Sequence, residues 1–476
     1  MSGISDVLVI GAGVSGACVA RRLSAYELDV VLVDREPDVS FGTSKANSGI
    51  VHGGFHHSGA KLKARLEIQG NLMFDRLKRE LDFPFERCGI VVAALHDEEM
   101  RAIEQLHRQG LENGAVGIEM CSRERILELE PALGPEVVGG LHAPGGGIVE
   151  PYRFVFAVVE SALKNGVSLQ TGFKAVRAER VGEIWRVHAE DGRAIDARWV
   201  VNAAGLYADE VSALFGAEDF AIKPRKGEYY LLDRAARAKP RKVVFPVPSA
   251  NSKGMLVIPT VEGTVLVGPT ADDVGDKGDF GTTRERLERI LASARSLVPA
   301  VSEADVIASF AGLRPVSGDD FYIDLSARAP NLVQVAGIQS PGLTASPAIG
   351  EYVKDLLKKG GLRLVEKASY DPFLEPKPRV RETDAFGIDR LVAEDPAYGN
   401  IVCRCERVSE AEIVAAIRAG HDTLDGIKYF TRAQMGRCQG GFCTYRIVKI
   451  IMRETGKDWD EVTKRGGASR LVEGEL

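Results

Sequence analysis

Residues 7–16 of the chain have the sequence VLVIGAGVSG, in which four apolar residues run directly into a glycine-rich turn. A helical pattern follows to about Tyr26, and a second apolar run at residues 30–33 ends at Asp34. We therefore predict a strand, a turn, a helix and a second strand, which together form a βαβ unit. Such a unit predicts an α/β fold built on a parallel sheet.

The glycine spacing of this turn is that of a dinucleotide site. The first glycine permits the tight turn, the second lets backbone N–H groups approach a pyrophosphate, and the third lets the helix pack against the strand. Asp34 can then accept hydrogen bonds from a ribose 2′-OH, which disfavours the 2′-phosphate of NADP. The alternative is a glycine-rich helix start that binds nothing. The residues concerned are Gly11, Gly13, Val14, Ser15, Gly16, Asp34 and Arg35.

Length and composition limit the class of protein. The chain has 476 residues, of which 45% are hydrophobic and 27% charged, as in ordinary globular proteins of two or three domains. The formal net charge of -6 argues against nucleic acid as a partner. The first five residues lack the basic start of a signal peptide, and we find no uncharged run long enough to span a membrane. We expect a cytoplasmic protein.

Two further strand-to-helix junctions indicate an interleaved arrangement of domains. Apolar residues 199–201 lead into a helix that runs through Phe215, and residues 332–337 lead into a helix over about 344–359. The segments between these junctions are rich in strands, and proline and charge mark a later linker. We predict a first domain from residues 1–75, 150–215 and 326–360, a second from 76–149 and 216–325, a linker over 361–400 and a third unit over 401–476.

The sequence up to about residue 360 resembles the superfamily of glycine oxidase and D-amino-acid oxidase. Besides the glycine turn, the resemblance is carried by residues 42–54, 201–205, 310–315 and 337–344. It implies a Rossmann-like FAD-binding domain interleaved with a mixed-sheet substrate domain. A helix that starts near Leu343 would aim its N-terminal dipole at the flavin edge where negative charge accumulates on reduction. Beyond the glycine turn, the resemblance implies FAD contacts at Thr43, Ser44, Asn47, Ser48, Gly49, Val176, Ala203, Ala204, Gly205, Gly312, Gly337, Gly342, Leu343 and Thr344.

Four of the seven cysteines are clustered near the C-terminus, as Cys403-x-Cys405 and Cys438-x4-Cys443. Thiolates in two pairs suit zinc or an iron-sulfur cluster, although structural zinc favours wider pairs than C-x-C. Residues 401 to about 455 resemble the BFD-type ferredoxin domain, a small and mainly helical unit. That resemblance implies a 2Fe-2S cluster on all four thiolates. We further predict that Ser409 and Glu412 form a capping box and that a helix begins next to Cys443.

A flavin site joined to a one-electron centre predicts a dehydrogenase, because an oxidase needs no cluster. The combination resembles the A subunit of anaerobic glycerol-3-phosphate dehydrogenase, and parts of the catalytic region are also similar to L-2-hydroxyglutarate dehydrogenase. Both oxidise the CH–OH group of a small anion, and glycerol 3-phosphate is the first candidate. The alternatives are oxidation of an amino acid or opine at a CH–NH group, and an electron-transfer subunit whose flavin is reduced by a partner protein.

The same resemblances suggest which residues act on the substrate. Arg314 is expected to anchor the anion, since a guanidinium binds phosphate or carboxylate bidentately. His52 is the candidate base for the hydroxyl proton, or else a histidine that holds the loop under the flavin or tethers it covalently. His56, Lys61 and Tyr229 are further substrate candidates. The His56-His57 pair replaces the Arg-Tyr of aerobic glycerol-3-phosphate dehydrogenases, and Tyr229 stands where they carry a histidine, which puts phosphate recognition in question.

The expected partners follow from this chemistry. Electrons would pass from the cluster to redox partner subunits or a quinone-linked acceptor, and any membrane association would come through a partner. The other three cysteines, Cys18, Cys88 and Cys121, stand alone and are expected to be small core residues.

Overall fold

The computed structural model describes residues 3–248 and 254–472. The described chain forms two compact units, unit 1 from residues 1–35 and 39–374 and unit 2 from residues 36–38 and 375–476. Unit 1 holds the glycine turn, and unit 2 holds the four clustered cysteines.

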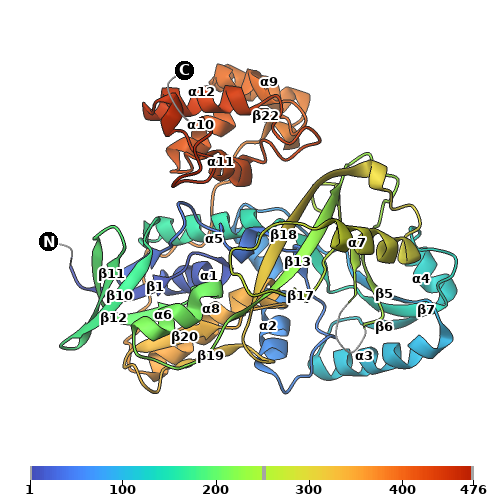
Figure 1. Ribbon diagram of the computed structural model, residues 1–476, viewed down its shortest axis with the longest axis horizontal. Coiled ribbons are helices and arrows are strands. Elements are labelled where there is room, and N and C mark those ends of the chain that lie inside the picture. Colours follow the sequence, from blue (N-terminus) through green and yellow to red (C-terminus); the bar gives the residue numbers. More distant parts are fainter. Residues whose placement is uncertain (1–2, 249–253, 473–476) are drawn as a thin grey trace. The chain divides into compact units, whose positions relative to one another are not determined.

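The βαβ unit predicted from residues 7–34 lies at the centre of an eight-stranded sheet in unit 1 (Figure 1). β1 pairs in parallel with β2 and with β12, and parallel pairs also join β2 to β9 and β12 to β20. Of these parallel strands, β1, β2 and β20 are buried almost throughout, as expected for strands covered on both faces, whereas β9 at the edge is more exposed. Its strands are β1 (Ser5–Ile10), β2 (Val30–Val33), β9 (Ser168–Gln170), β10 (Ala175–Val181), β11 (Ile184–Ala189), β12 (Ala194–Asn202), β19 (Tyr322–Leu325) and β20 (Leu332–Ala336).

Helices α1 and α8 pack against each other beside this sheet, and α5 and α2 pack on them in turn. Both helices begin where a parallel strand ends, as the sequence predicted, although α1 ends at Leu23 and not near Tyr26. The helices associated with this part of unit 1 are α1 (Val14–Leu23), α2 (Leu62–Glu80), α5 (Pro151–Lys164), α6 (Ala208–Leu214) and α8 (Gly342–Lys359).

Unit 1 also contains a nine-stranded sheet, in which successive residues of a strand point to opposite faces. Val91 and Ala93 belong to a core that includes α4 and α7, whereas Ile90, Val92 and Ala94 belong to a core that includes α3. The sheet consists of β5 (Ile90–Ala94), β6 (Glu119–Ser122), β7 (Gly139–Ala143), β13 (Lys223–Leu232), β14 (Val243–Pro246), β15 (Leu256–Pro259), β16 (Val265–Gly268), β17 (Asp272–Asp273) and β18 (Val306–Val316), with helices α3 (Met100–Asn113), α4 (Arg123–Leu129) and α7 (Arg284–Leu297).

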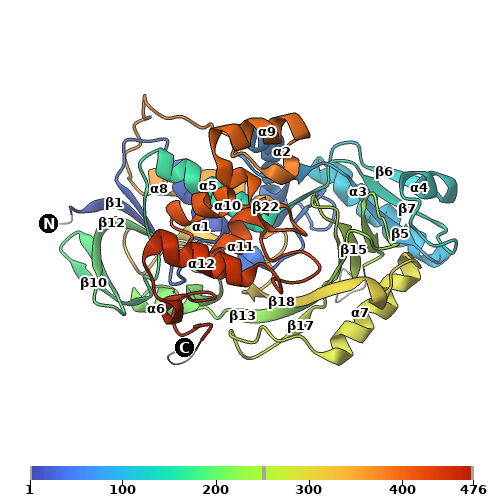
Figure 2. The ribbon, with the colours of Figure 1, turned by 90° about the horizontal axis from the view of Figure 1, so that it is seen from above.

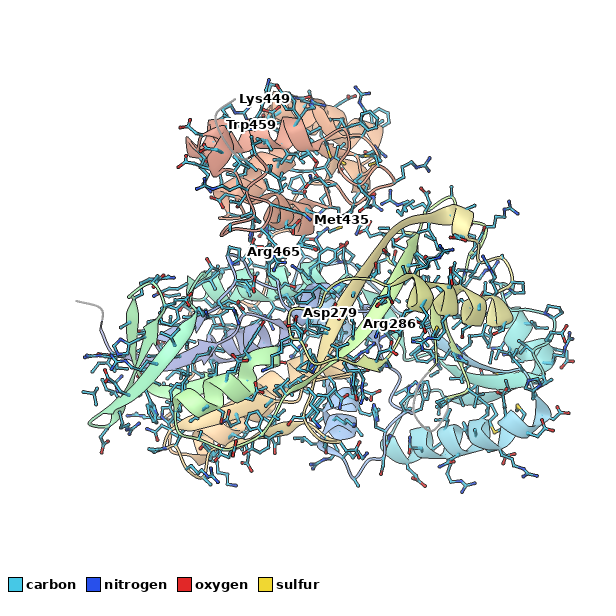
Figure 3. All side chains as sticks on the ribbon, in the orientation of Figure 1. Asp279, Arg286, Met435, Lys449, Trp459 and Arg465 are labelled. Atoms are coloured by element: carbon cyan, nitrogen blue, oxygen red, sulfur yellow. The ribbon has the colours of Figure 1, made fainter. Side chains whose placement is uncertain are left out.

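β18 pairs with β13 along almost its whole length, and both views show the two strands side by side with α7 next to them (Figures 1 and 2). The α7 side of β13 carries a buried ionic network. Glu228 is fully buried and accepts from Arg286, and Lys226 donates to Asp279. Asp279 and Arg286 lie close together beside β13 (Figure 3). The opposite face of the strand is therefore the one left for other chemistry.

A third, three-stranded sheet holds the segment after residue 49 in place. β3 (Ile50–Val51) and β4 (Phe85–Glu86) both pair with β8 (Gly147–Val149).

Cys18, Cys88 and Cys121 are all buried, as expected for small core residues.

Unit 2 is mainly helical, as predicted, with one short hairpin of β21 (Ile401–Cys403) and β22 (Val408–Ser409). Ser409 and Glu412 form the predicted capping box, and α12 begins directly after Cys443. Its helices are α9 (Ala385–Glu394), α10 (Glu410–Arg418), α11 (Leu424–Thr431) and α12 (Thr444–Thr455).

The segment 361–400 differs from the linker that proline and charge suggested. Unit 2 begins within it at Glu375, and it contains helix α9. The Asp384 carboxylate caps this helix by accepting from the Gly387 N–H at 2.7 Å, and Val380 just before it is 2% exposed. A short helix with a good cap and one buried anchor is compatible with a polar composition.

Candidate flavin and iron-sulfur sites

The glycine turn is shaped by close backbone packing. Gly11 has φ +109°, and a Cβ there would lie 2.3 Å from the Ala203 carbonyl oxygen. A Cβ at Gly16 would lie 1.8 Å from the Gly11 carbonyl oxygen. Larger residues at either position would force the helix away from the strands, so the sequence-based roles of these two glycines match the geometry. Ala203, Ala204 and Gly205 follow β12 and lie beside the same turn.

The N-terminus of α1 is suited to an anion. Its N-cap is Gly13, which has no side chain to cap it, and its first turn holds no acidic residue. The Ser44 hydroxyl accepts from the Val14 N–H at 2.9 Å, which brings the segment around residue 44 to the helix end. A helix N-terminus with no acidic residue in its first turn and a hydroxyl beside it fits a pyrophosphate.

Asp34 and Arg35 lie at the end of β2, beside the glycine turn. One Asp34 carboxylate oxygen accepts from the Ala12 N–H at 2.6 Å, and the Arg35 guanidinium lies 4.0 Å from the centre of the Tyr207 ring. Val176 lies apart on β10, at a register shift in its pairing with β11, and its side chain is 42% exposed. The assignment of these three residues to FAD stays a prediction.

Residues 43–49 connect the glycine turn to β18. The Thr43 hydroxyl donates to the Leu313 carbonyl at 2.7 Å, and a Cβ at Gly312 would lie 1.9 Å from the Ala46 carbonyl oxygen. The Asn47 side chain closes a local turn, since it accepts from the Gly49 N–H and donates to the Ser44 carbonyl. Two motifs far apart in sequence, residues 43–49 and 310–315, therefore touch. Ser48 lies within the local turn that the Asn47 side chain closes.

The loop before α8, together with the first turn of that helix, contacts the segment that follows residue 49. Gly337 has φ +68°, and α8 starts at Gly342 without a side-chain cap or an acidic residue in its first turn. Leu343 is partly buried in that turn, whereas Thr344 is fully buried. The Thr344 hydroxyl accepts from the His52 N–H at 2.9 Å and donates to the Ile50 carbonyl at 3.2 Å. The Thr344 side chain thus holds β3, and only its backbone can serve a cofactor.

His52 and His56 lie close together, as their joint assignment to the reaction site required. Their ring centres are 5.8 Å apart, and His56 also stacks on Phe55 and Phe245 at 4.2 and 5.0 Å. His52 is 7% exposed, and its Nε2 lies 3.2 Å from the Ser340 hydroxyl. The histidine loop, residues 52–57, is therefore a packed aromatic structure beside the loop that precedes α8.

Side chains that the sequence analysis did not single out hold this loop. Asn71 donates to the His52 carbonyl at 2.6 Å, and buried Glu67 accepts from the Gly54 N–H at 2.8 Å. Asn113 donates to the carbonyls of Gly54 and His57. These residues could have been identified in the sequence, because they are polar residues on the inner faces of α2 and α3, where apolar residues are expected.

Arg314 lies on β18, on the face turned away from the ionic network. Its guanidinium donates to the Thr270 carbonyl at 3.3 and 3.4 Å and lies over Gly227 of the facing strand. In the described part of the chain no carboxylate pairs with it, whereas its ladder partner Arg225 is paired with Asp273 at 2.6 Å. A partly buried guanidinium with only a backbone carbonyl for a partner can still bind an external anion.

The two remaining substrate candidates have different environments. Tyr229 is 2% exposed and stacks on Phe310 at 4.8 Å, on the same face of the β13–β18 ladder as Arg314. Lys61, by contrast, forms an ion pair with Asp319 at the start of α2. The adjacent Asp320 carboxylate accepts from the N–H groups of residues 62 and 63 and so caps that helix. The structure thus gives Lys61 a structural partner.

The four cysteine thiols of unit 2 lie close together. Sγ–Sγ distances are 3.9 Å from Cys403 to Cys405 and 3.8 Å from Cys405 to Cys438, and the Cys443 thiol hydrogen-bonds to Cys403. Among the described residues, no group of three or more histidines, cysteines and acids surrounds a single metal ion. Four neighbouring thiols suit two irons with two thiolates each.

The backbone around the thiols is shaped for close approach. A Cβ at Gly436 would lie 2.4 Å from the Cys405 Sγ. Burial and the neighbouring thiols raise the pKa of Cys405 to about 12, so that metal binding would have to displace its proton. Six non-glycine residues of the described chain have positive φ, and four of them flank the thiols, namely Arg407, Arg432, Gln434 and Gln439. Strained backbone concentrated at one place is typical of a binding site.

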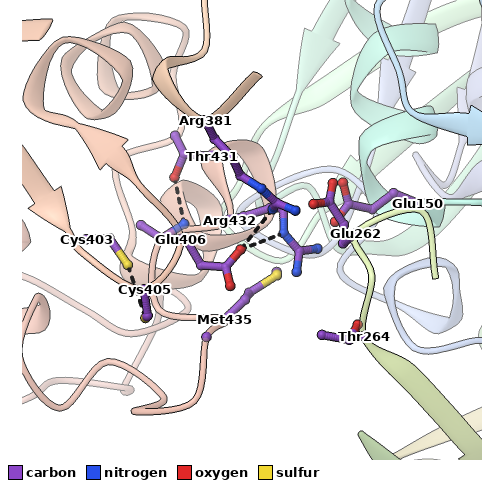
Figure 4. Close-up of polar contacts among 12 residues, drawn as sticks. Glu150, Glu262, Thr264, Arg381, Cys403, Cys405, Glu406, Thr431, Arg432 and Met435 are labelled. Carbon is purple, nitrogen blue, oxygen red and sulfur yellow. Dashed lines mark hydrogen bonds and ion pairs between the residues drawn. The ribbon is translucent and has the colours of Figure 1, made fainter. Parts of the chain in front are cut away.

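A buried ion triad of Glu406, Arg381 and Arg432 lies next to these loops (Figure 4). Glu406 is 2% exposed and binds Arg381 at 3.0 Å and Arg432 at 3.1 Å. Arg381 comes from the segment before α9 and Arg432 from the end of α11. The triad therefore joins three separate segments next to Cys405.

Comparisons with known proteins match both units. Residues 6–356 match the family of FAD dependent oxidoreductases, and residues 401–453 match the BFD-like [2Fe-2S] binding domain. The chain is 41% identical to a glycerol 3-phosphate dehydrogenase of Caloramator mitchellensis, over 98% of each chain. It is 26% identical to the anaerobic glycerol-3-phosphate dehydrogenase subunit A1 of Haloferax volcanii, over 98% of this chain and 85% of that protein.

Among solved structures, the fold is similar to that of L-alpha-glycerophosphate oxidase from Mycoplasma pneumoniae, which was solved with FAD bound. The TM-score is 0.75 at 30% identity, over 79% of this chain and all of that one. Among residues 3–248 and 254–472, no helix has both the length and the apolar character needed to cross a bilayer.

Proposed function

Because this chain belongs to the family of FAD dependent oxidoreductases and carries a BFD-like [2Fe-2S] domain, we propose that it is a dehydrogenase that oxidises glycerol 3-phosphate to dihydroxyacetone phosphate. The electrons leave through the cluster to an acceptor other than oxygen. The observation that carries the substrate assignment is the similarity, along the whole chain, to a protein named for this activity. The relatives also support a catalytic subunit that works with redox partners, and any membrane association would come through them.

The bound FAD would supply the hydride acceptor, and the residues around it would orient the substrate. Arg314 holds the anionic group of the substrate, because its guanidinium has two donors directed at nothing stronger than a backbone carbonyl. Tyr229 and Phe310 form the apolar wall on the same face. Anchoring the anion at one end fixes the CH–OH carbon at the other, which lowers the entropy cost of reaching the reactive geometry.

His52 accepts the hydroxyl proton in this proposal. Its ring is buried among His56 and Phe245, and its backbone is fixed on both sides by Thr344 and Asn71. Imidazole titrates near neutral pH and can therefore take a proton at an unsubstituted nitrogen. The same packing would also support a purely structural histidine, so the test below separates the two roles.

The substrate is tested by anaerobic steady-state assays in which the holoenzyme reduces an artificial dye. Glycerol 3-phosphate should bleach the flavin and drive dye reduction, whereas L-2-hydroxyglutarate and iminodiacetate should not. Bleaching by L-2-hydroxyglutarate alone would transfer the assignment to that substrate, and bleaching by iminodiacetate alone would indicate CH–NH oxidation. A flavin that only a partner protein can reduce would identify an electron-transfer subunit.

The role of His52 is tested with His52→Gln, which retains a hydrogen-bonding side chain but cannot accept the proton. A catalytic base predicts a fall in kcat of about 10²-fold or more and loss of the corresponding limb of the pH profile, with FAD retained. An unchanged pH profile, together with lower FAD content, would assign His52 to holding the loop.

A further inference from the structure

The cysteine loops expose an aromatic side chain where a protein normally buries it. Phe442, the residue before Cys443, is 83% exposed, and Tyr445 on the first turn of α12 is 57% exposed. Cys405 and Cys438 are partly exposed, whereas Cys403 and Cys443 are buried. The site for the cluster is therefore open at Cys405 and Cys438, and the residues on either side of its buried thiol Cys443 include two exposed aromatic rings.

The charges around this opening all have one sign. In the loops 403–407 and 436–445 the exposed charged residues are Arg404, Arg407 and Arg437. The one acid in these loops, Glu406, is buried in its ion triad and contributes no free negative charge. The whole chain has a net charge of -6, so this positive region stands against the overall charge.

The neighbouring surface of α12 adds one exposed lysine and a second exposed aromatic ring, whereas Asp458 and Asp460, on either side of Trp459, are exposed acids. The Lys449 ammonium lies 4.5 Å from the centre of the Tyr445 ring, which in turn packs against Trp459 at 5.6 Å. Lys449 and Trp459 lie on the same side of unit 2 (Figure 3). We call this surface the cluster face and define it by its exposed residues Arg404, Arg407, Arg437, Phe442, Tyr445 and Lys449.

We propose that the cluster face is the docking surface for a one-electron acceptor protein whose own redox centre is surrounded by acidic residues. A small aromatic centre with a charged rim is suited to a short-lived complex, in which complementary charge gives fast association and little area is buried. The proposal rests on the proposed function, which supplies the electrons. In each encounter the reduced cluster gives one electron to the acceptor, and two encounters complete the oxidation of one substrate molecule.

The test measures binding and electron transfer separately, with the full-length holoenzyme. The probes are cytochrome b5, an acidic haem protein, and cytochrome c, a basic one. Binding is measured by biolayer interferometry at low and high salt, and haem reduction by stopped flow after addition of glycerol 3-phosphate. Dye reduction without any protein acceptor reports on the proposed function alone. If the dye assay fails, the proposed function fails; if only acceptor docking fails, the inference fails.

The variants are Phe442→Ala and Lys449→Glu, both at exposed positions, and each is first checked for iron content. Phe386→Ala is the matched control, because Phe386 on α9 is also 83% exposed. Arg390→Glu on the same helix is the control for charge reversal at an exposed position. We expect cytochrome b5 binding and reduction to weaken about tenfold in each test variant, equivalent to about 1.4 kcal/mol, and to stay unchanged in both controls.

Three results would overturn the inference. The first is tighter binding of cytochrome c than of cytochrome b5. The second is slower reduction of the cluster by substrate in the two test variants with unchanged cytochrome b5 binding, which would assign the face to electron entry from the flavin. The third is loss of binding to phosphatidylglycerol vesicles with unchanged cytochrome b5 binding, which would make the face a lipid contact.

Discussion

The guanidinium of Arg314 occupies the space that a side chain at Gly227 would fill. A Cβ on Gly227 would lie 2.7 Å from Arg314 Nη2 and 2.9 Å from Pro269 Cβ. The two residues lie on neighbouring strands, β18 and β13, where Gly227 faces Gly312 and Arg225 faces Arg314. The position of Arg314, the proposed anion anchor, is thus set by the absence of a side chain on the strand beside it.

This contact predicts a selective effect of Gly227→Ala. The guanidinium is the flexible end of a long side chain and can move away, whereas Pro269, 2.9 Å from the added Cβ, must shift as well. We expect KM for glycerol 3-phosphate to rise about tenfold, equivalent to about 1.4 kcal/mol, with a lower melting temperature and an FAD spectrum that changes little. The control is Gly275→Ala, since a Cβ at Gly275 meets nothing within 4 Å. Equal KM values for both variants would contradict the assignment.

Arg314 itself should not tolerate replacement by lysine. Lysine keeps the charge but loses the planar pair of donors, so Arg314→Lys should raise KM about tenfold or more and leave FAD binding intact. Arg225→Lys is the matched control, because Arg225 lies directly opposite in the ladder but is paired with Asp273. Steady-state kinetics with both variants decide the matter, and a KM effect as large for Arg225→Lys would remove the distinction.

Thr344→Val tests the connection between α8 and the histidine loop. Valine has nearly the same shape but no hydroxyl, so the buried His52 N–H loses its acceptor. An unsatisfied buried donor costs about 1–3 kcal/mol, and we expect the unfolding free energy from urea denaturation to fall by that amount. Thr344→Ser should restore most of it. Full stability of the valine variant would show that the hydrogen bond contributes little.

Gly436→Ala should remove the cluster without removing the flavin. The added Cβ would lie 2.4 Å from the Cys405 Sγ, so this thiol could not keep its position. We expect iron content to fall well below that of the wild type, while FAD content and dye reduction at the flavin persist. Gly399→Ala is the control in the same unit, because its Cβ would meet only Val392 at ordinary contact distances. Normal iron loading of Gly436→Ala would exclude this geometry.

Glu406→Gln is expected to destabilise unit 2 strongly. It removes the charge that two arginines share in a buried site, and removal of one partner from a buried ion group costs about 3–5 kcal/mol. Urea denaturation of the full chain, followed through the visible absorbance of the cluster, should show an earlier transition for unit 2. The transition of unit 1, followed through flavin fluorescence, should not move. A parallel shift of both transitions would mean that the triad does not act locally.

The sequence predicted the elements that depend on local patterns. The βαβ unit, the helix starts after β12 and β20, the capping box at Ser409 and the helix after Cys443 are all present. Each is encoded by adjacent residues, namely apolar runs, glycines, a cap or a cysteine pair. The sequence motifs at these places also carried the resemblance to the family.

What the sequence could not provide is contact between distant segments. Nothing local to Gly312 indicates that it must admit the Ala46 carbonyl, and nothing local to Asp320 indicates that it caps α2. The pairing of Lys61 with Asp319 has the same origin, and the assignment of Lys61 to the substrate stays a prediction. Helix α9 was missed because charge and proline dominate the composition of its segment.

The left-handed residues around the thiols have a consequence for how the protein matures. The backbone of four residues has a positive φ, which residues other than glycine disfavour, at a cost of order 1–3 kcal/mol each. These residues are Arg407, Arg432, Gln434 and Gln439. A newly made chain must adopt these conformations before it binds iron, and metal ligation offsets their free-energy cost. We therefore expect iron-starved cells to produce a chain whose flavin unit is intact but whose cysteine loops are open to proteases, so that iron supply would set the lifetime of the electron outlet.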